Sequence, residues 1–224
     1  MARLASLRIK VNGAPLGQTG TLYVSNHVSY LDIPVLAVLT DAAFVAKDDV
    51  KDWPLFGLCA KLYRTLFIRR DAREALGQRA EMAARLATGD SLMLFPEGTS
   101  SDGIHVLPFK SALFAVADAA PGADQPRVQP VSIAYTRYAD GRPLERGLRA
   151  LYAWYGDMTL LPHLISVFGL RGAMVEVTFH APVQARDFAN RKALAAHCHD
   201  KVSTGVTRAP WRGGGAANPP ARPG

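Results

Sequence analysis

Short runs of β-forming residues alternate with segments of helical periodicity along most of this chain, which restricts the folds open to it. Strands are predicted at 7–11, 21–25, 44–46, 65–69, 91–95, 128–135, where Pro130 interrupts the run, and 175–179. Helices are predicted for about ten residues up to Thr40 and at 58–63, 72–87 and 111–119, with Ser111 as an N-cap. The alternation predicts an α/β fold: a single-domain sandwich with a largely parallel central sheet flanked by helices.

The length of 224 residues is enough for one substantial hydrophobic core. We assign residues 1–206 to a single domain. Residues 207–224 are mostly glycine, proline, alanine and arginine, a composition that predicts a disordered tail.

Basic residues outnumber acidic ones, 26 to 19, giving a net charge of +7. This excess favours acidic partners such as nucleic acid, anionic lipid headgroups, or phosphorylated and acidic proteins. Nucleic acid is the least expected of these, because the sequence has no recognised reading motif and few aromatic residues beside its arginines. Charge alone does not choose among the others.

The cysteine count and the hydropathy pattern bear on the compartment. Only Cys59 and Cys198 occur, so no disulfide framework is expected and a reducing cytosol is the simplest setting. Residues 1–13 lack the apolar core of a signal peptide, and no later stretch offers about 20 uninterrupted apolar residues. We therefore expect no spanning segment, although attachment to an anionic membrane surface remains compatible with the composition.

The segment 25–32 carries a histidine and an aspartate at positions 27 and 32. A neutral imidazole can take a proton from an alcohol, and a carboxylate on its other nitrogen would fix the tautomer. On one straight helix the two side chains would lie about 140° apart, but a strand at 21–25 followed by a helix start places His27 in a turn, from which Asp32 is reachable. The alternative is a capping box, in which Ser29 and Asp32 merely support the helix N-terminus.

Further polar residues follow two other predicted strands. Arg69 and Arg70 end one strand, and the loop 96–101 follows another. The carboxyl ends of parallel strands meet at one edge of a sheet, so these loops would converge with His27 in the crevice that a two-substrate enzyme needs. The arginines suit a phosphate or carboxylate and the loop suits a polyol or phosphate, but a solvated basic face and a purely structural loop are the alternatives.

Other motifs point to no additional chemistry. The cluster at 197–200, His-Cys-His-Asp, lacks a second ligand group at zinc spacing, and we interpret it as part of a surface helix, with no metal site. His105, His163 and His180 have no partner identifiable from the sequence. The chain has no Gly-x-Ser-x-Gly elbow, P-loop or Gly-x-Gly-x-x-Gly turn, which argues against the common hydrolase, NTPase and dinucleotide-binding classes.

Taken together, these segments resemble the glycerolipid acyltransferase family that includes 1-acyl-sn-glycerol-3-phosphate acyltransferase. The resemblance extends over roughly residues 7–200 and follows the order of the family's conserved blocks. The first block is the His-x-x-x-x-Asp motif. The matching segments are 26–32, 66–70, 95–101 and 128–132, with further likeness at 44–47 and 53–57.

The resemblance implies direct transfer of a fatty acyl group from a thioester, acyl-CoA or acyl carrier protein, to the free hydroxyl of a lysophospholipid. His27 would be the general base and Asp32 its orienter. No covalent acyl-enzyme, metal or redox cofactor is expected. Residues expected to hold or shape the acceptor site are Arg69, Arg70, Glu97, Gly98, Thr99, Ser100 and Pro130.

The sequence departs from the family pattern at three positions. Ser100 stands where arginine is usual, Arg64 where glycine opens the second block, and Arg69 where that block has an acidic residue. The anion site is therefore expected to be rearranged. The family's N-terminal apolar helix has no counterpart before His27, so attachment is expected through the basic start or the segment 160–170, which is either interfacial or core.

The resemblance implies conversion of 1-acylglycerol-3-phosphate to phosphatidic acid, by a peripheral enzyme on the cytoplasmic face of the inner membrane. A lysolipid with a carboxylate headgroup, such as lyso-ornithine lipid, is the alternative acceptor, because Ser100 weakens the case for phosphate. A catalytically silent lipid-binding protein with the same fold is the alternative from another class.

Overall fold

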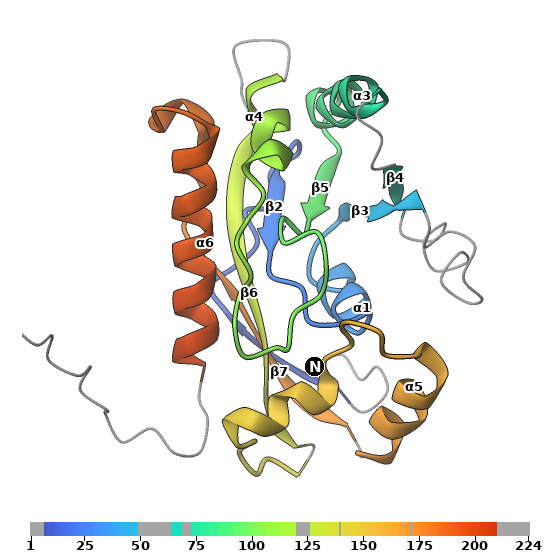
Figure 1. Cartoon of the computed structure of the whole chain (residues 1–224). Coiled ribbons are helices and arrows are strands. Elements are labelled where there is room, and N and C mark those ends of the chain that lie inside the picture. The colour runs from blue at the N-terminus through green and yellow to red at the C-terminus, as the bar shows by residue number, and fades with distance from the viewer. Residues whose placement is uncertain are drawn as a thin grey trace, which may run out of the picture.

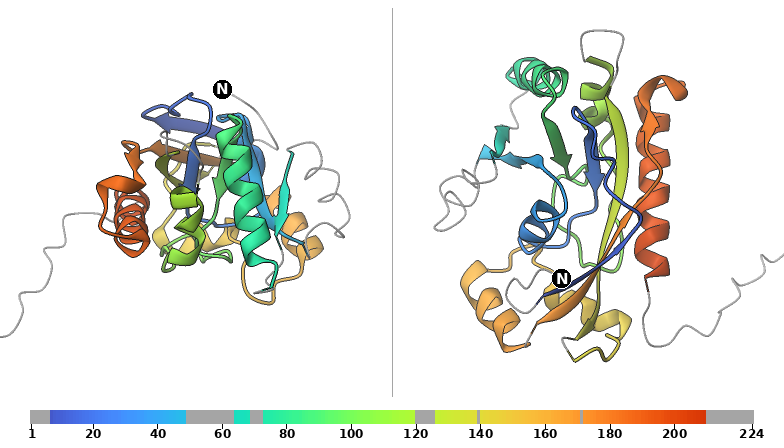
Figure 2. Two further views of the ribbon diagram at one scale, coloured as in Figure 1. Left: turned by 90° about the horizontal axis from the view of Figure 1, so that it is seen from above. Right: turned by 180° about the vertical axis from the view of Figure 1, so that it is seen from behind.

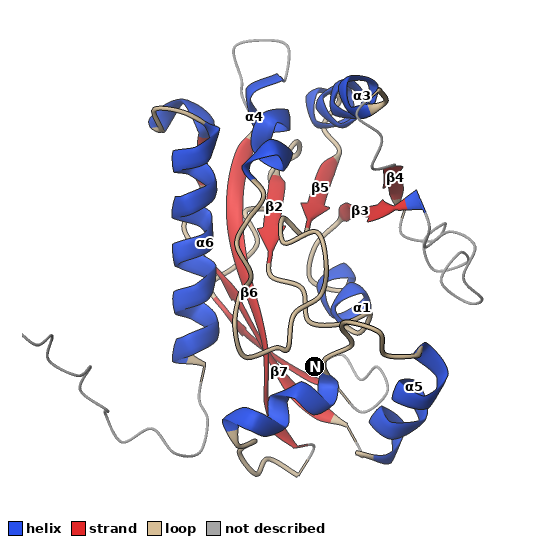
Figure 3. Ribbon diagram, in the orientation of Figure 1, coloured by secondary structure: helices blue, strands red, loops and turns tan. Residues whose placement is uncertain are grey.

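The computed structural model describes residues 7–48, 64–68, 73–119, 126–138, 140–170 and 172–209 (Figure 1). Outside these residues lie the predicted helix at 58–63, Cys59, Arg69, Arg70 and the end of the chain from residue 210. The described residues form one layer of β-sheet with helices on both faces (Figure 3). The predicted α/β class is confirmed.

Each predicted strand has a counterpart in the sheet, because the β-branched and aromatic runs supply side chains that suit two-sided burial. One further strand, β8, was not predicted. The strands are β1 (Arg8–Asn12), β2 (Leu22–Ser25), β3 (Ala42–Lys47), β4 (Leu66–Ile68), β5 (Ser91–Leu94), β6 (Arg127–Tyr138), β7 (Ala173–Phe179) and β8 (Val183–Gln184).

Within the described residues the strands form an eight-stranded sheet in the order β1-β7-β6-β2-β5-β3-β4, with β8 paired to β6. The pairs β1–β7, β2–β5, β2–β6, β3–β5 and β3–β4 are parallel, whereas β7 and β8 pair with β6 in the antiparallel sense. The sheet is therefore largely parallel, as predicted. The central neighbours β6, β2 and β5 carry the loops discussed below.

The helices and 3-10 turns connect these strands. No helix in the described part of the chain is long and apolar enough to cross a membrane. The elements are α1 (Asp32–Ala37), α3 (Ala75–Ala87), the 3-10 helix η2 (Ser111–Phe114), α4 (Ala115–Ala119), the 3-10 helix η3 (Arg146–Tyr152), α5 (Leu160–Gly169), the 3-10 helix η4 (Ala185–Asp187) and α6 (Arg191–Arg208).

The sheet separates two hydrophobic clusters. On one face α1, η3 and α5 pack through residues such as Val35, Tyr152 and Val167. On the other, α3, α4 and α6 contribute residues such as Leu86 and Leu194, and Figure 2 shows these three helices side by side on that face. Burial on both faces explains why β2 and β5 are largely apolar runs without polar alternation.

Three local predictions differ from the structure. Lys110, extended at φ −74° and ψ 102°, is the N-cap of η2 and no side chain caps it, so the prediction of Ser111 as the cap is wrong. Strand β6 continues through Pro130 without a break, because Pro130 lies where the partner of β6 changes from β8 to β7. Helix α6 continues to Arg208, two residues into the predicted tail.

Candidate active site

The turn after β2 is fixed to the neighbouring strand by Asn26. Its side-chain amide donates to the Ile133 carbonyl at 3.0 Å, and its side-chain oxygen accepts the Ile133 backbone N–H at 2.9 Å. Both groups of the buried amide are thereby satisfied. This clamp to β6 holds the backbone immediately before His27, so the histidine leaves the sheet in a defined direction.

His27 and Asp32 are in contact, as predicted. The ring Nδ1 of His27 lies 2.8 Å from Oδ2 of Asp32, and the carboxylate is fully buried. The same oxygen accepts the backbone N–H groups of Val28 at 2.6 Å and Ser29 at 3.0 Å. The capping alternative and the catalytic one therefore describe one arrangement, because a single carboxylate both closes the turn and orients the ring.

Tyr135 is a further partner of this pair that sequence reasoning missed. From β6 its hydroxyl donates to Oδ1 of Asp32 at 3.0 Å. Burial, together with the charge of Asp32, holds the pKa of Tyr135 well above its usual value, so the phenol keeps its proton and donates it. The signal in the sequence is that Tyr135 lies in the predicted strand 128–135 at the same side-chain parity as Val131 and Ile133, which pack on the α1 face.

Glu97 supports the backbone of the same turn. One carboxylate oxygen accepts the His27 N–H at 2.7 Å and the other accepts the Leu107 N–H at 2.8 Å. Burial raises the pKa of Glu97 to about 7, although these two hydrogen bonds act in the opposite direction. In this structure Glu97 joins the loop after β5 to the loop after β2, and its predicted contact with the acceptor stays a prediction.

The loop that contains Glu97 folds tightly against the His27 turn. Gly98 has a φ of +70°, a backbone conformation that favours glycine, and the Lys110 side chain packs over it. Thr99 is exposed beside it. Ser100, at the position where the family has arginine, donates its hydroxyl to the carbonyl of Trp154.

The remaining predicted residues fall into two groups. Pro130 is buried in β6 opposite Val24 of β2, and its carbonyl accepts the backbone N–H of His180 at 3.0 Å. It lies one strand away from the His27 turn, consistent with a role in shaping the site. Arg69 and Arg70 are outside the described residues, so their predicted contact with an anion stays a prediction.

This arrangement leaves one nitrogen of His27 available for chemistry. Asp32 accepts from Nδ1, which assigns the ring proton to that atom and leaves the lone pair on Nε2. The ring stacks on Phe95 with centroids 4.2 Å apart, and 22% of the side chain is exposed. An imidazole with a fixed tautomer and a reachable Nε2 is equipped to act as a general base.

Comparisons with known proteins agree with this chemistry. The family model described as Acyltransferase matches residues 8–134, which is more than half of the chain and includes the His27 turn and the Glu97 loop. The chain belongs to this acyltransferase family. The match ends within β6, so it covers the strands that hold His27, Glu97 and Pro130.

Similar proteins extend the likeness across most of the chain. A lyso-ornithine lipid O-acyltransferase of Brucella abortus is 44% identical over 90% of this chain and 77% of that protein. A 1-acyl-sn-glycerol-3-phosphate acyltransferase of Neisseria gonorrhoeae is 32% identical over 86% of this chain and 70% of that protein. The crystal structure of the 1-acyl-sn-glycerophosphate acyltransferase PlsC of Thermotoga maritima aligns with a TM-score of 0.60 and 25% identity, covering 89% of this chain and 70% of that one.

Each of the three histidines His105, His163 and His180 of this acyltransferase has a polar partner in the structure. His105 contacts Asp102 at 3.0 Å, His163 contacts the Tyr30 hydroxyl at 3.1 Å, and His180 contacts Ser132 at 2.6 Å. Among the described residues no group of three or more histidine, cysteine, aspartate or glutamate side chains is placed to hold a metal ion.

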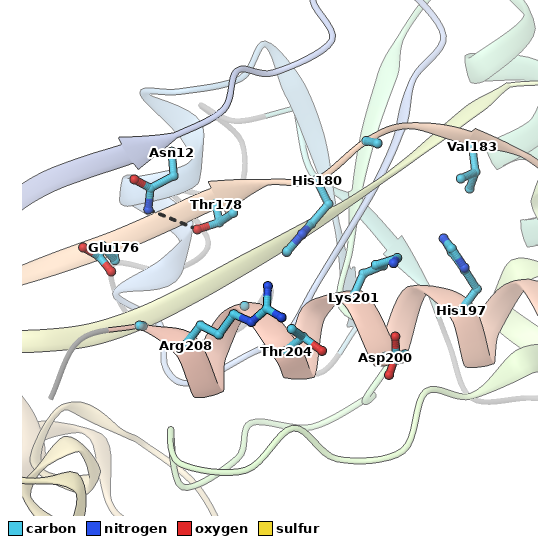
Figure 4. A pocket seen from close by; sticks show the side chains of 13 residues that line it. Asn12, Glu176, Thr178, His180, Val183, His197, Asp200, Lys201, Thr204 and Arg208 are labelled. Atoms are coloured by element: carbon cyan, nitrogen blue, oxygen red, sulfur yellow. Dashed lines mark hydrogen bonds between the residues drawn. The ribbon is translucent and has the colours of Figure 1, made fainter. Parts of the chain in front are cut away.

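The acyltransferase also has a hollow of about 720 Å³ away from the His27 turn. Figure 4 shows Lys201, Thr204 and Arg208 on α6 facing Thr178 and His180 across it. None of His27, Asp32 and Glu97 lines this hollow. The candidate active site is therefore the surface around His27, at the carboxyl ends of β2 and β5.

Proposed function

We propose that this enzyme transfers a fatty acyl group from an acyl thioester to the free hydroxyl of a lysolipid. The observation that carries the proposal is the contact of His27 with the fully buried Asp32, while 22% of the His27 side chain stays exposed. Nε2 takes the proton of the hydroxyl as its oxygen attacks the thioester carbonyl. The C–S bond then breaks, and the leaving thiolate accepts the proton from the imidazolium.

Asp32 acts throughout as the orienting group. It holds the proton on Nδ1 and stabilises the imidazolium that forms, while Tyr135 and two backbone N–H groups keep its carboxylate in place. The hydroxyl attacks directly, so no covalent acyl-enzyme forms. The thioester supplies the driving force, and the proposed reaction uses no metal or redox cofactor.

For the acceptor we propose a lyso-ornithine lipid. Ser100 stands at the position where the family pattern has arginine, and its hydroxyl donates to the Trp154 carbonyl. The loop therefore offers no long cationic side chain at that position. An ornithine headgroup carries one carboxylate and one ammonium group and needs fewer cations than a phosphate does. The relative that is 44% identical bears this acceptor in its name.

A 1-acylglycerol-3-phosphate is the second candidate acceptor. The predicted role of Arg70 favours it, and so does the name of the relative that is 32% identical. The donor is proposed to be acyl-CoA or acyl carrier protein. Both carriers are anionic, and the net charge of +7 suits either.

The proposed location is peripheral, at the cytoplasmic face of the inner membrane. Both donor thioesters are made in the cytosol, while a lysolipid acceptor resides in a bilayer. An enzyme that joins them works where the two meet, and an anionic lipid surface would attract its basic residues.

A panel of lysolipids tests the choice of acceptor. Purified enzyme is incubated with acyl-CoA or acyl carrier protein and an equimolar mixture of lyso-ornithine lipid and lysophosphatidic acid, and the products are identified by mass spectrometry. We expect acylated ornithine lipid to dominate. Dominant phosphatidic acid would favour the second candidate, and no acylation of either would contradict the proposal.

Ser100→Arg sharpens the same assay. Restoring the arginine should raise the rate with lysophosphatidic acid relative to lyso-ornithine lipid by about 10-fold, the size of one charge-assisted contact of about 1.4 kcal/mol. His105→Arg is the control, because it adds the same side chain at an exposed position of the segment after β5 that is not among the predicted acceptor residues. An equal shift in both variants would show that position 100 has no special part in headgroup selection.

A further inference from the structure

Helix α5 exposes a row of large apolar side chains. Leu161 and Ile165 are each 65% exposed and Phe168 is 61% exposed. Their spacing of four and three residues places them on one face of the helix, as successive turns require. We call these three residues the α5 ridge.

The opposite face of α5 is buried, so the helix turns its apolar ridge to the outside, unlike an ordinary surface helix. Val167 and His163 on that face are buried against the protein, and the sequence Leu160–Gly169 contains no charged residue. A surface helix normally turns a polar face to water. The apolar surface continues beyond the helix, because Tyr155 and Met158 just before it are each 39% exposed.

Helix α5 is joined to the catalytic turn through hydrogen bonds. Nδ1 of His163 lies 3.1 Å from the hydroxyl of Tyr30, which stands between His27 and Asp32 in the sequence. Burial raises the pKa of Tyr30 to about 12 and lowers that of His163, so this contact joins two neutral side chains. The backbone N–H of Trp154, in the segment leading into α5, donates to the Val28 carbonyl at 3.0 Å.

The charges near α5 suit an anionic surface. Helix α5 ends at Gly169 and β7 begins at Ala173. Met174 on β7 is flanked in register by Arg8 of β1 and Arg137 of β6. Arg8 is exposed. Arg8 and Arg137 thus lie on the strands beside the start of β7, the strand that follows α5. Apolar side chains together with basic ones are the combination that binds a bilayer interface.

We propose that the α5 ridge is the surface by which the enzyme docks on the lipid bilayer that holds its acceptor. The proposal rests on the proposed function, since a lysolipid acceptor is what brings the enzyme to a bilayer. The helix has 10 residues and is about 15 Å long, half the hydrocarbon thickness of about 30 Å. It therefore lies in the interface, with the ridge among the acyl chains.

Docking in this way would bring the His27 turn to the lipid surface. The contacts of Tyr30 with His163 and of Val28 with Trp154 connect the helix to that turn. The acceptor could then present its hydroxyl at the interface while its acyl chain stays in the bilayer. This avoids the cost of about 0.8 kcal/mol for each CH₂ group transferred into water.

Vesicle flotation tests the proposal directly. The probe is the purified full chain with vesicles of phosphatidylglycerol and phosphatidylethanolamine. Replacing all three ridge residues, Leu161→Gln, Ile165→Gln and Phe168→Gln, should weaken partitioning by about 10²-fold, and Ile165→Gln alone by about 5-fold. The matched control is Leu76→Gln, which alters a side chain 76% exposed on α3 and should leave partitioning unchanged.

An acylation assay with a short-chain, monomeric acceptor separates this proposal from the proposed function. The triple variant should keep the wild-type rate with that acceptor and lose about 10-fold or more with acceptor presented in vesicles, as its weaker partitioning requires. If the wild type binds vesicles through the ridge but acylates neither acceptor, the proposed function fails and the docking surface stands.

Two results would overturn the docking proposal. One is equal vesicle binding by the wild type and the triple variant. The other is found by analytical ultracentrifugation: the wild type is a dimer, the triple variant is a monomer, and both bind vesicles equally. The ridge would then be covered by a second copy of the chain. Circular dichroism on the triple variant checks that it is folded. If it is not, the single variant Ile165→Gln carries the test.

Discussion

Two histidine–aspartate pairs lie in loops that follow neighbouring strands, with similar contacts but different degrees of burial. His27 and Asp32 follow β2 and are 2.8 Å apart, and His105 and Asp102 follow β5 and are 3.0 Å apart. In both pairs the aspartate also accepts two backbone N–H groups of its own turn. A short contact of this kind is thus a common product of a tight turn.

The two pairs differ in the burial and hydrogen bonding of their aspartates. Asp32 is fully buried and receives a fourth donor from Tyr135, whereas the Asp102 side chain is 31% exposed and that of His105 is 69% exposed. An exposed pair can rearrange in water and contributes little. A buried carboxylate that is hydrogen-bonded on every side holds the imidazole in one tautomer and orientation. Burial of the orienting group, more than the contact itself, marks the catalytic histidine.

Among substitutions of the residues that surround the two histidines, the largest effect is expected for Asp32→Asn. In one orientation the asparagine amide would place its N–H opposite Nδ1–H, and in the other it would offer an uncharged oxygen. In neither case would a carboxylate hold the proton of His27 on Nδ1. We expect kcat/KM to fall by about 10²–10³-fold. Asp102→Asn is the matched control and should stay within about 2-fold, as expected for an exposed pair. Equal losses in the two variants would remove the distinction drawn between the pairs.

The next effect is the pH dependence that Glu97 gives to the free energy of unfolding. Its pKa of about 7 is raised mainly by burial, so the folded state binds a proton that the unfolded state releases near pH 4.5. Stability from this group is therefore full below about pH 4.5 and is lost as the pH rises to 7, by about 3 kcal/mol. Urea unfolding across this range should show a steeper fall for the wild type than for Glu97→Gln. Identical slopes would contradict the predicted proton uptake.

Tyr135→Phe removes one donor from Asp32 and should cost about 1.5–3 kcal/mol of stability, together with a loss of activity. Tyr152 provides the control, because its ring stacks on that of Tyr135 and its hydroxyl donates to the Gly172 carbonyl instead. Tyr152→Phe should cost about 1 kcal/mol and leave kcat unchanged. Thermal unfolding and kinetics on both variants measure this. Unaltered kcat in Tyr135→Phe would exclude a role in orienting the pair.

The smallest effect is expected for His105→Ala. The pair it breaks is exposed, so the free energy of unfolding should change by about 0.5 kcal/mol or less and the acylation rate by less than about 2-fold. Chemical denaturation and the standard assay together measure both quantities. A large loss of activity would place the second pair in the catalytic machinery.

Features that depend on neighbouring residues were predictable from the sequence. The strand at 21–25, the turn and the helix start together predicted the contact of His27 with Asp32, because only a few residues separate them. The β-forming runs likewise predicted the parallel core of the sheet. The N-cap of η2 was wrongly predicted, because the Lys110 N–H bonds to the Pro96 carbonyl and holds the chain extended one residue earlier than local preference suggests.

Features that depend on contacts distant in the sequence were not predictable. Tyr135 reaches Asp32 across 103 positions, and Ser100 reaches Trp154 across 54. No local pattern encodes such pairs, since they arise only when β6 lies beside β2 and when the segment before α5 packs on the Glu97 loop. The exposure of the α5 ridge is of the same kind, because periodicity alone left that segment either interfacial or core.

The most direct test of the central claim is acylation by His27→Ala beside His105→Ala in one assay, with acyl-CoA and lyso-ornithine lipid. We expect His27→Ala to lose about 10²–10⁴-fold of the acylation rate and to keep vesicle binding, while His105→Ala stays close to the wild type. If His27→Ala acylates the lipid within a few-fold of the wild-type rate, His27 is not the general base and the account is wrong.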